Sequence, residues 1–176
     1  EHVIRRAKYF DINPIVCTTI EASDDRIIDI AKTEGVRYFR GSVKDKLIRW
    51  LDACREHNID KFVSIDADDP FFDGALSYQS IETLGNSFDI VKHPIQQPNH
   101  GYSEGCVGYS IRLDTIEKAC ELKTTDDTEM VWNFIEKVPD VRVGYLQVEN
   151  DDVQCPIRLT LDYEEDYSLM NYMVRI

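Results

Sequence analysis

Three aspartates lie within four positions near the middle of the chain, directly after a stretch that favours β-structure. Residues 61–65 are mostly apolar, Asp66, Asp68 and Asp69 follow, and Pro70 ends the expected strand. Clustered carboxylates repel one another unless a positive group neutralises them. Because ligands of open α/β sheets bind beyond the carboxyl ends of the strands, the pattern favours a strand end that offers oxygen ligands to a hard divalent cation. An acidic turn that caps the next helix is the alternative.

A second expected strand, far along the chain, also ends in a carboxylate. Residues 157–162 alternate in polarity and finish at Asp162, and a final helix begins at 164–166. Two strand ends from distant segments can meet over one metal ion in a mixed α/β sheet. The alternative is that Asp162 is the N-cap of the last helix, with Glu165 three residues later completing a capping box.

Hydrophobic periodicity predicts alternating helices and strands over the whole chain, which we expect to form one domain. Such short connections with helices between strands indicate right-handed βαβ units, a mainly parallel sheet and an α/β fold of the three-layer, doubly wound type. The expected strands cover 14–19, 36–40, 61–66, 88–92, 106–111, 141–146 and 157–162, and the expected helices cover 1–8, 23–35, 44–57, 73–84, 113–122, 125–137 and the residues from 164 onward.

Composition excludes several classes of partner. The net charge of −13 disfavours binding to a nucleic acid polymer or to an anionic membrane, since both require a basic face. No stretch approaches the roughly 18 apolar residues of a membrane span. The five cysteines form no C-x-x-C pair, which indicates reduced thiols and a cytoplasmic protein rather than a zinc site.

The segment 93–109 differs from the rest because it is polar and rich in proline and glycine. It is too long for a simple connector, which indicates a functional or interface segment.

Taken together and in order, six stretches resemble a known enzyme family. The stretches are 1–6, 23–27, 36–41, 66–70, 104–105 and 158–166, the last of which reads R-x-T-x-D-x-x-E-D. The sequence is similar to the cytidylyltransferases that make CMP-activated acidic sugars, namely the CMP-sialic acid and CMP-Kdo synthetases, and more nearly to the spore-coat-polysaccharide type. The resemblance implies a nucleotide-diphospho-sugar transferase-like fold.

The resemblance also implies a reaction, in which a hydroxyl of an acidic sugar attacks the α-phosphorus of CTP and pyrophosphate leaves. Asp68 and Asp162 would hold Mg²⁺ against the phosphates. Asp66 would be an outer-sphere ligand or the base for the attacking hydroxyl. Arg158 would contact a phosphate or the sugar carboxylate, or it pairs with an internal acid.

The remaining residues implied by the resemblance lie at the two ends of the substrate. Ser23 and Asp24 would contact the nucleotide. The alternative is that they cap the helix that follows them. Tyr102 and Glu104 would shape the sugar site, or they belong to an ordinary surface loop. The segment 93–109 and the strand after it resemble the element through which related enzymes form homodimers.

One family element does not occur in the sequence. It is a glycine- and arginine-rich loop that cradles the triphosphate with backbone N–H groups and fixed cations, and it would precede the first helix. That helix begins without a cap, so we expect upstream sequence and little or no activity from these 176 residues alone. A non-catalytic binding or assembly module, and a nucleotidyltransferase for another phosphonate or sugar phosphate, are the alternatives.

Overall fold

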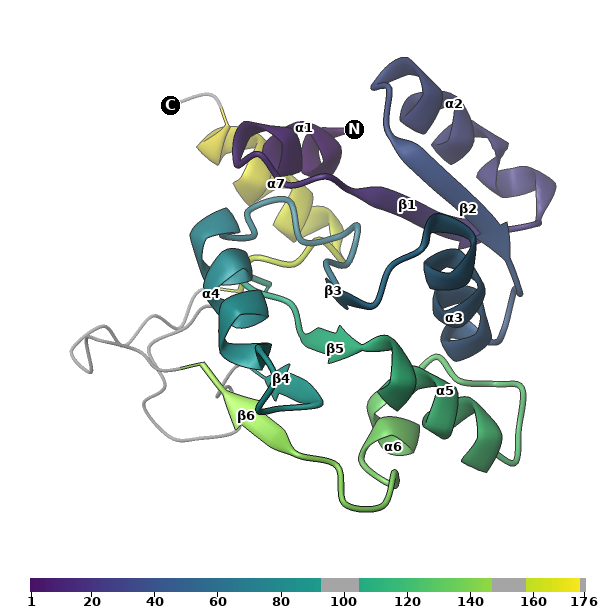
Figure 1. The fold of residues 1–176 in the computed structure, drawn as a ribbon. Coiled ribbons are helices and arrows are strands. Elements are labelled where there is room, and N and C mark those ends of the chain that lie inside the picture. Colours follow the sequence, from purple (N-terminus) through teal and green to yellow (C-terminus); the bar gives the residue numbers. More distant parts are fainter. Residues whose placement is uncertain (93–104, 147–157, 175–176) are drawn as a thin grey trace.

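In a computed structural model of the chain, residues 1–92, 105–146 and 158–174 are described (Figure 1). The helices in these ranges are α1 (His2–Tyr9), η1 (Ala22–Asp24), α2 (Asp25–Thr33), α3 (Lys46–His57), α4 (Gly74–Leu84), α5 (Leu113–Leu122), α6 (Trp132–Ile135) and α7 (Glu164–Met173). The strands are β1 (Ile15–Thr19), β2 (Arg37–Gly41), β3 (Lys61–Val63), β4 (Ile90–Lys92), β5 (Ser110–Arg112) and β6 (Val143–Tyr145). None of the helices in these ranges is both long and apolar enough to cross a membrane.

The strands form two groups that helices cover (Figure 1). β1 and β2 pair in parallel, and α2 and α3 pack on this pair. The second sheet has the order β3-β5-β4-β6. In it β4 and β6 are parallel, whereas β5 is antiparallel to both of its neighbours. The α/β fold class is therefore confirmed, with one antiparallel strand that the periodicity did not distinguish.

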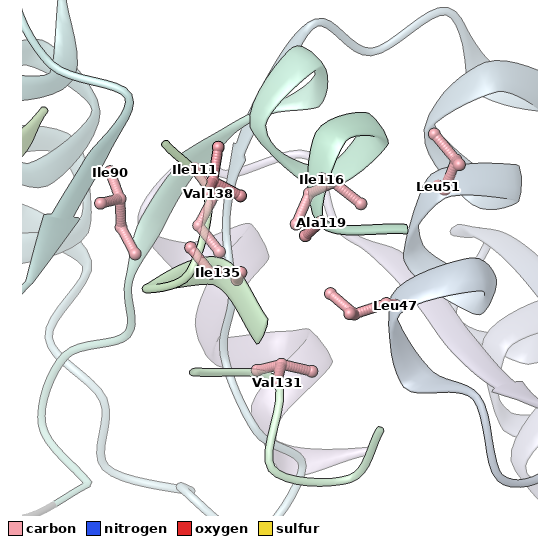
Figure 2. Packing of buried hydrophobic residues seen from close by; sticks show 9 residues of the cluster. All are labelled: Leu47, Leu51, Ile90, Ile111, Ile116, Ala119, Val131, Ile135 and Val138. Atoms are coloured by element: carbon pink, nitrogen blue, oxygen red, sulfur yellow. The ribbon is translucent and has the colours of Figure 1, made fainter. Parts of the chain in front are cut away.

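The main core lies where α3, α5 and α6 meet the second sheet (Figure 2). Leu47 and Leu51 of α3 face Ile116 of α5, and Ile90 and Ile111 come from the sheet. All five side chains are at most 4% exposed. Because Ile90 of β4 and Ile111 of β5 belong to this core, the packing of the core holds both strands in place.

Helix boundaries follow local capping chemistry at several of the expected places. The Asp45 side chain accepts a hydrogen bond from the Ile48 amide at 3.1 Å and begins α3. Asn58 ends that helix in the left-handed conformation, with φ 56°. Asp73 begins α4 by accepting from the amides of Ala75 and Leu76. These caps confirm the predicted helices over 44–57 and 73–84 to within two residues.

The predicted helix over 125–137 is wrong, since only Trp132–Ile135 is helical. The cause is Thr128, which is fully buried and donates its backbone N–H to the Lys44 carbonyl at 3.1 Å. Its hydroxyl also accepts from the Leu47 amide at 3.0 Å. These two hydrogen bonds tie Thr128 to the start of α3 and hold the residues around it in an irregular conformation.

The expected strand over 157–162 is also wrong for its described part, 158–162, in which only Arg158 has a β-bridge. The Leu161 amide instead donates to the Asp68 carbonyl at 2.7 Å. Residues 159–162 are therefore not a strand, and Leu161 bonds to the turn that follows β3.

Candidate active site

The site begins where β3 leaves the sheet. Pairing with the neighbouring segment continues one residue beyond β3, because the Ser64 amide donates to the Tyr109 carbonyl at 2.8 Å. The chain then turns, and the Asp69 amide donates to the Asp66 carbonyl at 3.1 Å. A β-carbon on Gly108 would lie 1.4 Å from the Ser64 carbonyl oxygen, so only glycine permits this approach of the two segments.

The turn gathers three carboxylates, which we call the acidic cluster: Asp66, Asp68 and Asp69. One carboxylate oxygen of each lies within 4.8 Å of the others. Asp66 is exposed, and the other two are half-buried. Oxygens that coordinate one Mg²⁺ ion are about 3 to 4 Å apart in octahedral geometry. Carboxylate oxygens are the donor type that a hard divalent cation prefers, and exposed acidic groups of this kind are also common without an ion.

The second acidic segment does reach this place, as Leu161 shows by its bond to Asp68. Gly105, with φ 80°, lies between the two segments. A β-carbon there would lie 2.7 Å from the Asp69 carboxylate and 3.0 Å from the Leu159 carbonyl. Three stretches distant in sequence are thus packed around the acidic cluster.

The carboxylate of Asp162 has a different partner. It forms an ion pair with Arg158, and it is not a member of the acidic cluster found among the residues that the structure describes. Sequence reasoning assigned Asp68 and Asp162 to the metal, whereas the geometry groups Asp69 with Asp68. The sequence signal for Asp69 was its position directly after Asp68, within the run of three aspartates at 66, 68 and 69.

Arg158 is bound to internal acids on both sides. Its Nη1 lies 2.7 Å from Asp166 Oδ2, in addition to the pair with Asp162. Asp166 also accepts from the Tyr163 amide at 2.9 Å. This backbone bond, followed by that of Arg158, lowers the pKa of Asp166. Of the two alternatives for Arg158, the structure shows internal pairing.

These bonds also correct the capping alternative for Asp162. The N-cap of α7 is Tyr163, and Asp166 at the third helical position accepts from its amide. The capping arrangement is therefore displaced by one residue from the expected pair of Asp162 and Glu165.

A lysine that sequence reasoning missed lies beside the acidic cluster. The Nζ of Lys46 is 3.4 Å from Asp66 Oδ1 and 3.6 Å from Glu129 Oε1. It also lies 5.5 Å from the centroid of the Trp50 ring. The available signal was its position in the first turn of a helix, where the helix dipole disfavours a cation.

An aromatic pair borders the same edge. The rings of Tyr109 and Trp132 have centroids 3.7 Å apart. Burial, and then the charges of Asp66 and Glu136, raise the pKa of Tyr109. The tyrosine hydroxyl is therefore protonated at neutral pH.

Ser23 and Asp24 lie in η1, and the Asp24 carboxylate is bound by residues at the end of β1. Its carboxylate accepts from the Thr18 hydroxyl at 2.7 Å, the Thr19 hydroxyl at 2.5 Å and the Thr19 amide at 3.0 Å. These bonds, chiefly that of the Thr19 hydroxyl, lower the pKa of Asp24 to about 2. Asp24 is at the N-cap position of α2, as the capping alternative predicts, but its carboxylate makes no capping hydrogen bond to that helix. Tyr102 and Glu104 lie outside the described residues.

Comparison with known proteins places the chain in a family. The uncharacterized protein MJ1063 of Methanocaldococcus jannaschii is 31% identical over 169 residues, which cover 94% of this chain and 67% of that protein. The chain belongs to the MJ1063 family. No family model matches the sequence.

Solved structures relate the MJ1063-family chain to cytidylyltransferases. A cytidylyltransferase from Leptospira borgpetersenii serovar Hardjo-bovis superposes with a TM-score of 0.85 at 26% identity, covering 99% of this chain and 74% of that chain. A 4-diphosphocytidyl-2C-methyl-D-erythritol synthase from Anaerococcus prevotii gives 0.63 at 16% identity, covering 99% and 88% of the two chains. Another synthase of this name gives 0.66 at 12%, covering 98% and 86%. The two synthases show the shared fold, and the first structure supports the cytidylyltransferase family.

Proposed function

We propose that this chain serves, as part of its enzyme, in the Mg²⁺-dependent transfer of a cytidylyl group from CTP to an acidic sugar, which gives a CMP-sugar of surface-glycan synthesis and pyrophosphate. The observation that carries the proposal is the acidic cluster at the end of β3, onto which residues 158–162 fold through the bond between Leu161 and Asp68. The overall similarity to a solved cytidylyltransferase at 26% identity supports the same reaction class.

The acidic cluster would hold the cation. Asp68 is its central ligand in the proposal, with Asp69 or Asp162 as the second carboxylate. Asp162 is 44% exposed, so exchanging Arg158 for a metal ion requires no opening of the core. When bound, Mg²⁺ neutralises charge on the phosphoryl oxygens and orients an in-line attack.

The other residues act on the substrates in this proposal. Asp66 receives the proton of the attacking hydroxyl or binds the cation through water. Arg158, once released by Asp162, contacts a phosphate or the carboxylate of the sugar. Ser23, next to the hydrogen-bonded Asp24 in η1, contacts the nucleotide, and Tyr102 and Glu104 contact the sugar.

Binding of CTP in the presence of Mn²⁺ or Mg²⁺ tests the proposal without requiring turnover. We expect Asp68→Asn to weaken CTP binding about 10–100-fold in isothermal titration, because a ligand of the cation is lost. Asp162→Asn weakens it as well if this carboxylate joins the metal. The control is Asp29→Asn on the exposed face of α2, which makes the same change in charge. Unchanged affinity in both site variants would contradict the function.

Turnover by the 176 residues alone is expected to be small. Lys46 lies beside the acidic cluster and Arg158 belongs to the segment whose Leu161 bonds to Asp68, and each of the two cations is paired with two carboxylates. They therefore offer little free positive charge to a triphosphate. Pyrophosphate release from CTP and sialic acid or Kdo, at a rate near the roughly 10 s⁻¹ that is typical of enzymes, would refute this expectation.

We also propose that the protein is a homodimer in which segment 93–109 contributes to the contact. That segment lies mostly outside the described residues, so the proposal derives from the family resemblance. Sedimentation at micromolar concentration should give about twice the 20.4 kDa mass of one chain, and a monomeric mass would contradict the proposal.

A further inference from the structure

Lys46 occupies a position that local energetics disfavour. It is the first residue of α3, where the partial positive charge of the helix end repels a cation, and the first turn of this helix contains no acidic residue. Its side chain is nevertheless only 16% exposed, and its Nζ lies over the Trp50 ring, 5.5 Å from the centroid. A lysine kept in such a place needs a compensating partner.

The backbone around Lys46 is held by buried hydrogen bonds. Thr128 binds the residues on both sides, through the Lys44 carbonyl and the Leu47 amide. The Thr128 hydroxyl also donates to Asp45 Oδ1 at 2.9 Å, and Lys123 Nζ lies 2.6 Å from the other oxygen of Asp45. Asp45 is 4% exposed and Thr128 is fully buried. The backbone from which the Lys46 side chain extends is therefore held in place.

The two partners of Lys46 are not bound tightly. Its distances of 3.4 Å to Asp66 and 3.6 Å to Glu129 exceed the roughly 2.7–2.9 Å of a short charge-assisted hydrogen bond. The side chains of Asp66 and Glu129 are 62% and 70% exposed. The ammonium group is thus placed between two carboxylates, one of which belongs to the acidic cluster.

We propose that Lys46 is a positioning residue with two successive partners. In the substrate-free protein its ammonium group is the counter-ion of Asp66 and so competes with a divalent cation for that carboxylate. When the cation and the nucleotide bind, Lys46 leaves Asp66 and binds a phosphate oxygen of the nucleotide, because its Nζ lies 3.4 Å from a carboxylate of the cluster that would hold the phosphates through the cation. This inference rests on the proposed function.

The first part is tested by titrating Mn²⁺ alone into the protein, followed by calorimetry or by the electron paramagnetic resonance signal of the free ion. Lys46→Met keeps an unbranched side chain of similar length and removes the charge, so we expect Mn²⁺ to bind on the order of tenfold more tightly. Lys46→Arg and the matched control Lys44→Met, which removes an exposed charge two residues earlier, should bind Mn²⁺ like the wild type. An unchanged affinity in Lys46→Met, or an equal gain in Lys44→Met, would overturn the counter-ion role.

The second part is tested with CTP at saturating Mn²⁺, so that altered metal affinity has no influence. Lys46→Met should bind CTP about tenfold more weakly because a charged hydrogen bond is lost, while Lys46→Arg retains most of the affinity. Cytidine, which has no phosphate, should bind equally to all variants. Equal CTP binding, or an equal loss for CTP and cytidine, would overturn the phosphate contact.

The two arms separate this inference from the proposed function. A wild-type protein that binds Mn²⁺ but no CTP contradicts the proposed function, and the Mn²⁺ titrations then decide the counter-ion role by themselves. Tighter binding of the cation together with weaker binding of CTP in one folded variant supports both parts.

Discussion

At the scale of single residues, the Asp24 carboxylate is stabilised by hydrogen bonds from residues a few positions earlier in the chain. The hydroxyls of Thr18 and Thr19 and the Thr19 amide all donate to it. They stabilise the ionised form, so the pKa of Asp24 in the folded protein, about 2, is below the ordinary value of 3.8. The corresponding stability is fully present above pH 4 and is lost as the pH falls from about 4 to about 2.

We therefore predict that Asp24→Asn reduces the acid dependence of the melting temperature between pH 5 and pH 2, because the substituted side chain does not titrate. Thr19→Val, which removes the largest of the three effects, should raise the pKa of Asp24 in a carboxyl NMR titration. Parallel melting curves for the wild type and Asp24→Asn across this pH range would contradict the assignment.

Residue identity predicted one part of the candidate site better than another. Asp66 and Asp68 lie near each other because acids after an apolar strand are brought together where that strand ends, and their roles at the site stay predictions. Lys46 was missed because its approach to Asp66 depends on the packing of α3 against the sheet. Pairing of Arg158 with Asp162 and Asp166 was left open for a related reason, since spacing alone does not state which acid faces the guanidinium group.

At the scale of elements, the buried hydrogen bonds of Thr128 connect the segment before α6 to the start of α3. A single buried hydroxyl serves the Leu47 amide and the Asp45 carboxylate. Replacing it by an apolar group of the same shape leaves both of these groups without that partner. The cost of such unsatisfied buried groups is about 1–3 kcal/mol.

Thr128→Val should accordingly lower the free energy of unfolding, measured by urea denaturation, by about 1–3 kcal/mol. Thr124→Val, at an exposed position with the same change in side chain, is the control and should have little effect. A stability loss no larger than that of the control would show that water or a neighbouring group replaces the hydroxyl.

The elements that the sequence could predict are those whose signals are local. Helices α3 and α4 begin at aspartate caps, and α5 has clear apolar spacing, so local chemistry was sufficient to locate them. The segment before α6 has acceptable helix spacing, but its backbone groups are bound by α3. Long-range hydrogen bonds of this kind leave no periodic signal, and the order β3-β5-β4-β6 with its antiparallel strand is likewise decided by tertiary packing.

At the scale of the whole molecule, the net charge of −13 opposes the approach of a nucleotide. The charges bound in ion pairs near the acidic cluster, such as those of Lys46 and Arg158, do little to reverse this field. Between like-charged partners, salt weakens the repulsion, since the screening length falls from about 30 Å at 0.01 M to about 10 Å at 0.1 M ionic strength. Association should therefore accelerate with salt, in contrast to steered binding by a basic cleft.

We predict that the association rate constant of CTP, measured by stopped flow at saturating Mn²⁺, rises several-fold between about 0.01 and 0.2 M KCl. Uncharged cytidine is the control and should associate at a rate independent of salt. The dissociation rate constant should change less, because the bound phosphates lie within contact distance of the cation and are poorly screened. A rate constant that falls with salt would mean that a local positive field at the site outweighs the charge of the whole chain, and it would direct attention to cations beyond Lys46 and Arg158.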